Sequence, residues 1–98
     1  MMPKVSILIP TYNQASYIEK AVESALAQTY GNLEIIVADD CSSDSTEQVI
    51  RRFQGDERVR YFRNSHNLGR VKNYKNALEN LATGDWVVNL DGDDFFCD

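Results

Sequence analysis

Apolar and polar residues alternate along the chain with two different periods. Four short runs are rich in apolar residues, and three longer stretches place an apolar residue every three to four positions, as one face of a helix does. The expected strands cover residues 5–9, 33–38, 59–62 and 86–90. Each helical stretch lies between two strands, an order that is typical of βα units in a parallel sheet. The pattern therefore predicts one α/β domain with a mainly parallel, four-stranded sheet.

Capping and helix-breaking residues set the expected ends of these elements. Pro10 is expected to end the first strand, because proline has no N–H to donate to the sheet. Ser16 and Glu19 have the spacing of a capping box at the start of the first helix, and Asp44 is a candidate cap for the second. Gly84 is expected to end the third helix, since glycine readily adopts the left-handed conformation that follows many helices.

The composition limits the partners of this domain. The chain has 98 residues, of which 15 are acidic and 10 are basic, and its formal charge is -5. This charge gives no general attraction to nucleic acid or to an anionic membrane surface. No apolar run is long enough for a membrane span or a signal peptide. Cys41 and Cys97 lie far apart without the spacing of a metal site, so we expect free thiols in a reducing cytosol.

The residues that follow the first strand are candidates for a binding site, because ligands of open parallel sheets bind at the carboxyl ends of the strands. These residues are Pro10, Thr11 and Tyr12. The Tyr12 ring could stack on a nucleobase, or it could be half-buried packing, and the sequence leaves both interpretations open.

Two adjacent carboxylates, Asp39 and Asp40, follow the second strand. A carboxylate at the end of a buried strand needs hydrogen-bond donors. The imino N–H of uracil, thymine or guanine would be such a donor. Alternatively, the two carboxylates bind loop amides while Asp44 caps the second helix.

A cluster of acids follows the fourth strand. Asp91, Asp93 and Asp94 surround Gly92, and Asp98 is close behind. So many carboxylates repel one another without a bound cation. Mn²⁺ and Mg²⁺ prefer oxygen ligands and can bridge carboxylates to a diphosphate, which would let an acidic site hold a negatively charged ligand. A solvated acidic turn is the alternative interpretation.

Basic residues in and after the third loop are candidates for phosphate contacts. They are Arg63, Arg70, Lys72 and Lys75, although a place on a solvated helix face is the more common role for each. His66 has no metal ligand or nucleophile at a recognisable spacing, so we expect it to make a loop hydrogen bond.

Four segments, taken together, resemble the inverting glycosyltransferase family 2. They read VSILIPTYN at 5–13, IVADDCSSDST at 36–46, NLG at 67–69 and LDGDD at 90–94. The resemblance covers almost the whole chain, with the family's order and spacing. It implies a Rossmann-like, three-layer α/β fold of the GT-A type, of which residues 1–98 would be the N-terminal, nucleotide-diphospho-sugar-binding half.

The resemblance also implies roles for individual residues. Tyr12 would lie against the base, Asp40 would hydrogen-bond the base, and Asp39 would help to shape its pocket. The acids of the last motif would bind the metal, the diphosphate and the ribose. The expected nucleotide contacts are Pro10, Thr11, Tyr12, Asp39, Asp40, Lys72, Asp91, Gly92 and Asp93. The expected ligands of Mn²⁺ or Mg²⁺ are Asp91, Asp93 and Asp94.

The chain departs from the family's pattern at two places. Cys41 stands where the family more often has glycine or asparagine, which changes the loop after the paired aspartates. Members often carry an arginine in the segment that matches 70–76, where this chain has Arg70, Lys72 and Lys75.

The activity implied by the resemblance is transfer of a sugar from a nucleotide-diphosphate sugar, with a UDP-sugar favoured, to an acceptor hydroxyl with inversion. The family's acceptor-binding half and catalytic base lie downstream of the acidic motif. We therefore expect residues 1–98 to bind donor and metal without a catalytic residue, as a fragment that ends just after that motif. The expected location is the cytoplasm, at the inner face of the membrane for a membrane-associated full-length protein. Apolar surface exposed by the missing half favours a homodimer.

Other classes fit the sequence less well. A receiver-type phosphotransfer domain would need a fifth strand followed by a lysine. A haloacid-dehalogenase-like phosphatase would carry its acidic loop at the start of the chain. A noncatalytic nucleotide-binding or interaction module remains the alternative to the glycosyltransferase.

Overall fold

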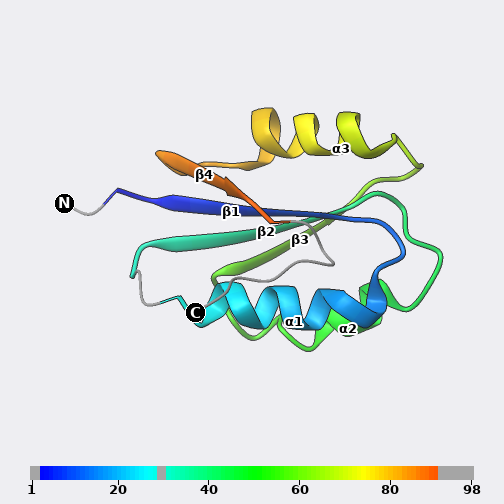
Figure 1. Ribbon diagram of the computed structural model, residues 1–98, viewed down its shortest axis with the longest axis horizontal. Coiled ribbons are helices and arrows are strands. Elements are labelled where there is room, and N and C mark those ends of the chain that lie inside the picture. The colour runs from blue at the N-terminus through cyan, green and yellow to red at the C-terminus, as the bar shows by residue number, and fades with distance from the viewer. Residues whose placement is uncertain (1–2, 29–30, 91–98) are drawn as a thin grey trace.

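The computed structural model describes residues 3–28 and 31–90, which form a four-stranded sheet between two layers of helices (Figure 1). The strands are β1 (Val5–Thr11), β2 (Leu33–Asp39), β3 (Val59–Arg63) and β4 (Trp86–Asn89). They pair in the order β3-β2-β1-β4, and every pairing is parallel. The predicted α/β class and the predicted parallel sheet are therefore confirmed.

Helices cover both faces of this sheet (Figure 1). α1 (Ala15–Leu26) and α2 (Thr46–Arg51) pack on one face. α3 (Arg70–Asn76), which continues into the π-helical turn η1 (Ala77–Leu81), packs on the other. None of the helices in the described ranges is long and apolar enough to cross a membrane. The chain winds from β1 to β3 in one direction and then returns past β1 to β4, and ligands of open α/β sheets bind at the strand ends beside such a reversal.

Both faces of the central strands are apolar, because each face is covered by helices. Alternate residues of β1 and β2 contribute to two separate cores. The core under α1 and α2 contains Ile7, Ile9, Ile18, Ala21, Val22, Ala25, Leu33, Ile35, Val37, Ile50 and Leu90. The smaller core under α3 contains Leu8, Ile36, Ala38 and Ala77. Burial of each leucine or isoleucine contributes about 1.5–3 kcal/mol, so the strands hold the loops at their ends in fixed positions.

The expected end of the first strand is wrong. β1 continues through Pro10 to Thr11, with Pro10 in register with Ala38 of β2. The Leu8 carbonyl accepts the Leu90 amide at 2.7 Å, so the even-numbered backbone groups of β1 face β4. The paired residues of β1 and β4 end at Leu8, so no β4 carbonyl needs the N–H that Pro10 lacks. Proline is tolerated in a sheet where no donor is required of it.

The predicted capping box of the first helix is also wrong. α1 begins at Ala15, so Ser16 already lies in its first turn, and the Asp44 carboxylate accepts the Ala15 amide at 3.2 Å. The same carboxylate accepts the amide of Thr46 at 3.0 Å and its hydroxyl at the start of α2. Burial by itself raises the pKa of Asp44, but these hydrogen bonds outweigh it and the pKa is lowered. The N-cap of α2 is Ser45, one residue later than expected, but the Asp44 carboxylate still binds the first amide of each helix.

A buried carboxylate at the amino ends of the strands ties the approach to β4 to the rest of the sheet. Glu34 is only 3% exposed, and it accepts the Ser6 hydroxyl at 2.6 Å and the Thr83 amide at 2.9 Å. The Arg60 guanidinium is a third donor at 2.8 Å. We call these four residues the Glu34 cluster. Burial raises the pKa of Glu34, but the donors outweigh it and lower the pKa to about 2.

Gly84 does not end the third helix, contrary to expectation. The helical segment ends at Leu81, and the Gly84 amide donates to the Ser6 hydroxyl at 2.8 Å. A Cβ atom at Gly84 would lie 2.6 Å from that hydroxyl oxygen. Glycine is therefore needed here for close approach to β1.

β4 is an edge strand whose four residues are all exposed. The Trp86 side chain, at the start of β4, is 66% exposed. Trp86 pairs with Val5 at the amino end of the sheet, so it lies at the opposite end from the loops that follow the strands.

Candidate functional site

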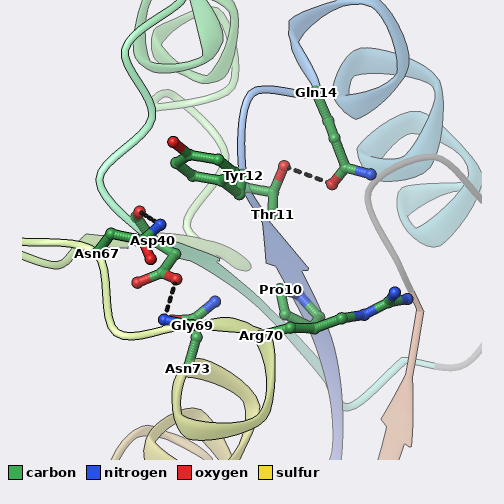
Figure 2. Close-up of a pocket in the computed structure, with 9 residues that line it drawn as sticks. All are labelled: Pro10, Thr11, Tyr12, Gln14, Asp40, Asn67, Gly69, Arg70 and Asn73. Carbon is green, nitrogen blue, oxygen red and sulfur yellow. Dashed lines mark hydrogen bonds between the residues drawn. The ribbon is translucent and has the colours of Figure 1, made fainter.

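A pocket of about 330 Å³ lies at the carboxyl ends of β1 and β2 (Figure 2). Three segments form it: the end of β1 with the following turn, the residue after β2, and the loop before α3 together with the first turn of α3. It is lined by Pro10, Thr11, Tyr12, Gln14, Asp40, Asn67, Gly69, Arg70 and Asn73. The fold thus brings together Pro10, Thr11, Tyr12 and Asp40 from the predicted contact residues.

Asp40 is a buried carboxylate in the wall of this pocket, with 3% of its surface exposed. Its Oδ1 accepts the Leu68 amide at 2.7 Å and the Asn64 side-chain amide at 2.9 Å. Its Oδ2 accepts the Gly69 amide at 2.9 Å, a bond drawn in Figure 2. A carboxylate has about four acceptor positions. Among the described residues, one acceptor position on Oδ2 is left for a further donor.

Asp39 lies behind the pocket and is not part of its lining. It is fully buried, and its Oδ1 accepts the amide and the hydroxyl of Ser42 at 2.9 and 2.6 Å. Its Oδ2 accepts the hydroxyl of Tyr61. Burial raises the pKa of Tyr61, and this hydrogen bond raises it further, so the Tyr61 proton stays on its oxygen. Asp39 therefore holds the loop after β2 with both carboxylate oxygens.

Tyr12 presents an aromatic ring at the pocket. Its side chain is 49% exposed, and Figure 2 shows the ring above Asp40. The backbone before it is fixed, because the Thr11 carbonyl accepts the Asp40 amide at 2.9 Å. An exposed aromatic face at a pocket can stack on a planar ligand. The Tyr12 side chain is about half exposed, so it can pack against its loop and also offer a ring face to a ligand, and stacking stays a prediction.

Three asparagines hold the loop between β3 and α3, and only one of them, Asn67, lies in a segment that the sequence marked, NLG at 67–69. The Asn64 side chain donates to Asp40 and to the side-chain oxygen of Asn73, both at 2.9 Å. Asn73 is buried and donates to the Ala38 carbonyl at 2.9 Å. The Asn67 side chain donates to the Asp40 carbonyl at 3.1 Å. Asparagines after a strand are a signal for such loop bonds, but periodicity does not reveal which acceptor they reach.

The candidate phosphate-binding residues lie in three different places. Arg70 lines the pocket. Lys72 and Lys75 line a separate hollow on the outside of α3 and η1. Arg63 donates to the Ser42 carbonyl at 3.1 Å. The fold therefore brings Arg70, and not Lys72, to the pocket of the other predicted residues.

Two further expectations concern loop residues. The predicted loop hydrogen bond of His66 is confirmed, since its Nδ1 lies 3.3 Å from the Ser65 hydroxyl.

Cys41 has a free thiol, as expected, and its backbone has a φ of +64°. This is the left-handed region, which glycine and asparagine adopt more easily than other residues. Cys97 lies outside the described residues.

The acidic motif that follows β4 falls outside the part of the chain that the structure describes. Asp91, Gly92, Asp93, Asp94 and Asp98 belong to it. The approach to this motif is described: the Leu90 amide donates to the Leu8 carbonyl at 2.7 Å, so the chain leaves β4 alongside β1. Within residues 3–28 and 31–90, no three His, Cys, Asp or Glu side chains are grouped as metal ligands.

Comparison with known sequences points to one family. Residues 6–98 match the family described as Glycosyl transferase family 2. The GalNAc(5)-diNAcBac-PP-undecaprenol β-1,3-glucosyltransferase of Campylobacter jejuni is 43% identical over 95 residues, which are 95% of this chain and 30% of that protein.

Solved structures with the same fold are glycosyltransferases. The mannosyltransferase PcManGT of Pyrobaculum calidifontis, in complex with GDP-Man and Mn²⁺, has a TM-score of 0.86 and 30% sequence identity over 98% of this chain and 29% of that one. TarS 1–349 of S. aureus, in complex with UDP-GlcNAc, has a TM-score of 0.78 and 29% identity over 94% of this chain and 27% of that one. These neighbours have the GT-A fold, which confirms the predicted fold type. The chain spans less than a third of the length of these three proteins. With nearly all of its residues matched, the chain belongs to glycosyl transferase family 2.

Proposed function

We propose that the chain is the N-terminal part of an inverting glycosyltransferase and that its pocket binds the nucleotide of a nucleotide-diphosphate sugar. The observation that carries this proposal is Asp40, a buried carboxylate below an exposed aromatic ring with one acceptor position open among the described residues. Such a pair suits a flat base with an N–H on its edge. Tyr12 would stack on the base, Pro10 and Thr11 would complete the wall, and Asp39 would hold the loop of Asp40.

The hydrogen bonds of Asp40 favour uracil over guanine. Its Oδ1 already accepts two hydrogen bonds and its Oδ2 accepts one. Guanine presents two neighbouring donors, N1–H and N2–H, and pairs best with both oxygens of a carboxylate. Uracil presents one imino N–H, for which one open acceptor position is enough. We therefore propose a UDP-sugar as the donor, which agrees with the UDP-GlcNAc bound to TarS.

A divalent cation, Mn²⁺ or Mg²⁺, is proposed for the acidic motif. Asp91, Asp93 and Asp94 offer the oxygen ligands that such ions prefer, and Gly92 would let the backbone approach the nucleotide. PcManGT, which has the same fold, was solved with Mn²⁺. A bound ion would offset the charges of the carboxylates and the diphosphate and stabilise the diphosphate as a leaving group.

Arg70 is the candidate for a direct phosphate contact from the described residues. It lines the pocket beside Gly69, at the start of α3. Lys72, one of the expected nucleotide contacts, lines the separate hollow on α3. A guanidinium can pair with phosphate oxygens through two N–H groups, so Arg70 suits a diphosphate better than a single ammonium does.

Sugar transfer itself is proposed for a longer protein. The chain spans 30% of the C. jejuni relative, so an acceptor site and a carboxylate general base are expected in the region that this chain does not span. The name of that relative includes an undecaprenol-linked substrate. We therefore propose that the full-length protein works in the cytoplasm at the inner face of the membrane.

Calorimetric titration with UDP, with and without Mn²⁺, tests this proposal. We expect tighter binding with Mn²⁺ and no such difference in the double variant Asp93→Asn/Asp94→Asn. The matched control Glu23→Gln/Glu57→Gln removes two exposed carboxylates elsewhere and should keep the difference. If the aspartate variant kept its metal dependence, the metal assignment would be wrong. If the unsubstituted chain bound no UDP under either condition, a noncatalytic interaction module would describe it better.

A further inference from the structure

We infer that Asn13 is a positioning residue, which fixes Tyr12 beside Asp40 by joining the loop after β1 to the loop after β2. Asn13 does not line the pocket. It follows Tyr12 directly, and one residue, Gln14, separates it from α1. The inference deepens the proposed function, because it names a residue that would set donor affinity without touching the donor.

The side chain of Asn13 is bound to a single segment across the pocket loops. Its Oδ1 accepts the Ser43 amide at 2.7 Å, and more weakly the Asp44 amide at 3.3 Å. The Asn13 backbone amide donates to the Ser42 hydroxyl at 2.8 Å. That hydroxyl donates in turn to Asp39 at 2.6 Å. The bridge therefore ends on a fully buried carboxylate of β2, which is a rigid support.

Tyr12 depends on these bonds of Asn13 because no hydrogen bond among the described residues holds its own side chain. In the described part of the chain, the Tyr12 side chain makes no hydrogen bond, and it is 49% exposed. The position of the ring depends on the backbone, which is held on one side by Thr11 in β1 and on the other by the backbone amide and the side-chain oxygen of Asn13. Asn13 has a φ of +52°, a conformation that asparagine tolerates better than most residues. Asparagine thus supplies both the backbone turn and the acceptor that holds it.

The first experiment needs no nucleotide. The substitution Asn13→Gly keeps the left-handed backbone and removes the side-chain acceptor, whereas Asn13→Asp keeps both. We expect the ¹⁵N relaxation order parameter of the Tyr12 amide to fall from a rigid value of about 0.85 toward about 0.6 in Asn13→Gly and to stay rigid in Asn13→Asp. A rigid Tyr12 amide in Asn13→Gly would overturn the inference. The exposed control Asn80→Ala should leave Tyr12 unchanged.

The second experiment asks whether Asn13 acts through Tyr12. UDP affinity, measured with Mn²⁺, is compared in a double-mutant cycle of Asn13→Gly and Tyr12→Ala. We expect Asn13→Gly to weaken UDP binding about fivefold to tenfold in the presence of Tyr12, and less than twofold in the Tyr12→Ala background. Equal losses in both backgrounds would show that Asn13 does not work through Tyr12.

The two experiments separate this inference from the proposed function. If the unsubstituted chain bound no UDP, the proposed function would fail, and the relaxation measurement would still decide the role of Asn13. If Asn13→Gly did not fold, Ser42→Ala would replace it, because that substitution removes the hydroxyl that accepts the Asn13 amide. A rigid Tyr12 amide in a folded Ser42→Ala variant would overturn the inference equally.

Discussion

Cys41 has a backbone conformation that is unfavourable for its residue type. It follows Asp40 directly, and its φ of +64° places it in the left-handed region. For a residue with a Cβ atom this conformation costs roughly 1–2 kcal/mol of conformational free energy. Only glycine, asparagine and aspartate adopt it routinely. This backbone conformation suits glycine or asparagine, the residues that the resemblance to family 2 leads us to expect here.

We predict that Cys41→Asn raises the free energy of unfolding by about 0.5–1 kcal/mol, because asparagine tolerates the left-handed backbone. Cys41→Val should lower it by at least about 1 kcal/mol, since β-branched residues are outliers in this region. Urea unfolding of the three proteins, followed by circular dichroism, measures both differences. A loss of stability in Cys41→Asn would contradict the assigned strain.

Asp40 gives a second prediction at this scale. Asp40→Asn exchanges one acceptor oxygen for an NH₂ group. In one orientation this group faces the Gly69 amide and the donor of the base, and in the other it faces the donors from Leu68 and Asn64. We expect UDP binding to weaken by about 1.5–3 kcal/mol, which is tenfold or more in Kd. Calorimetry with UDP checks this value, and Asp56→Asn, in the loop before β3, serves as the matched control. Unaltered affinity in Asp40→Asn would rule out Asp40 as the acceptor for the base.

Among the elements, β4 is held by the bonds of the turn before it to Glu34 and Ser6 as well as by sheet pairing. Glu34 interrupts the apolar run of β2 on the sequence, and nothing in the pattern indicates what it binds. In the fold, the Glu34 cluster joins β1, β2 and β3 to the turn before β4, and Lys4 lies 3.4 Å from the Glu34 carboxylate. The donors compensate the cost of burying the charge, which explains why this carboxylate is tolerated inside the sheet.

The Glu34 cluster predicts a defined pH dependence of stability. The pKa of Glu34 is lowered in the folded state from 4.5 to about 2, so its contribution is present above pH 4.5 and is lost as the pH falls toward 2. The shift corresponds to about 3 kcal/mol. We expect Glu34→Gln to reduce the free energy of unfolding by about this amount at pH 6, and by much less at pH 3. Urea unfolding at both pH values measures the difference; a constant difference would contradict the ionised cluster.

The elements also show which parts of the fold the sequence can predict. The strands and the helix-covered faces follow from hydrophobic period, since burial on both faces leaves a continuous apolar run. The ends of the strands and helices are harder to predict from the sequence, because tertiary contacts determine where each element stops. The Asp44 carboxylate, in the loop after β2, accepts the first amide of α1. The pairing of β1 with β4 ends before Pro10. Gly84 is required because a Cβ atom there would clash with Ser6. The π-helical turn η1 had no recognisable signal.

At the scale of the whole molecule, the site follows from topology more than from its individual bonds. Parallel strands carry the loops after β1 and β2 to one edge of the sheet, so Tyr12 and Asp40 could be placed together from the sequence. The residues that hold Tyr12 and Asp40 could not be predicted in this way. Asn13, Asn64 and Asn73 make bonds between segments, and no hydrophobic periodicity indicates their partners. The place of Arg70 in the pocket, in contrast to Lys72, depends on where α3 begins.

Self-association stays a prediction. Among the described elements, β4 is an exposed edge strand, and exposed apolar edges favour pairing with another chain. We expect the sedimentation coefficient of the chain to rise with its concentration. Trp86→Lys should reduce this rise, because a lysine on an edge strand opposes strand addition. A concentration-independent monomer would contradict the prediction.

The single tryptophan of the chain gives the molecule a built-in optical reporter. Its indole is exposed to water at the amino end of the sheet, away from the carboxyl-end pocket. Nucleotide that enters the pocket should therefore leave the wavelength of maximum tryptophan emission unchanged. A surface that covers β4 should shift this maximum to shorter wavelength. One spectrum can thus distinguish occupancy of the pocket from burial of the strand edge.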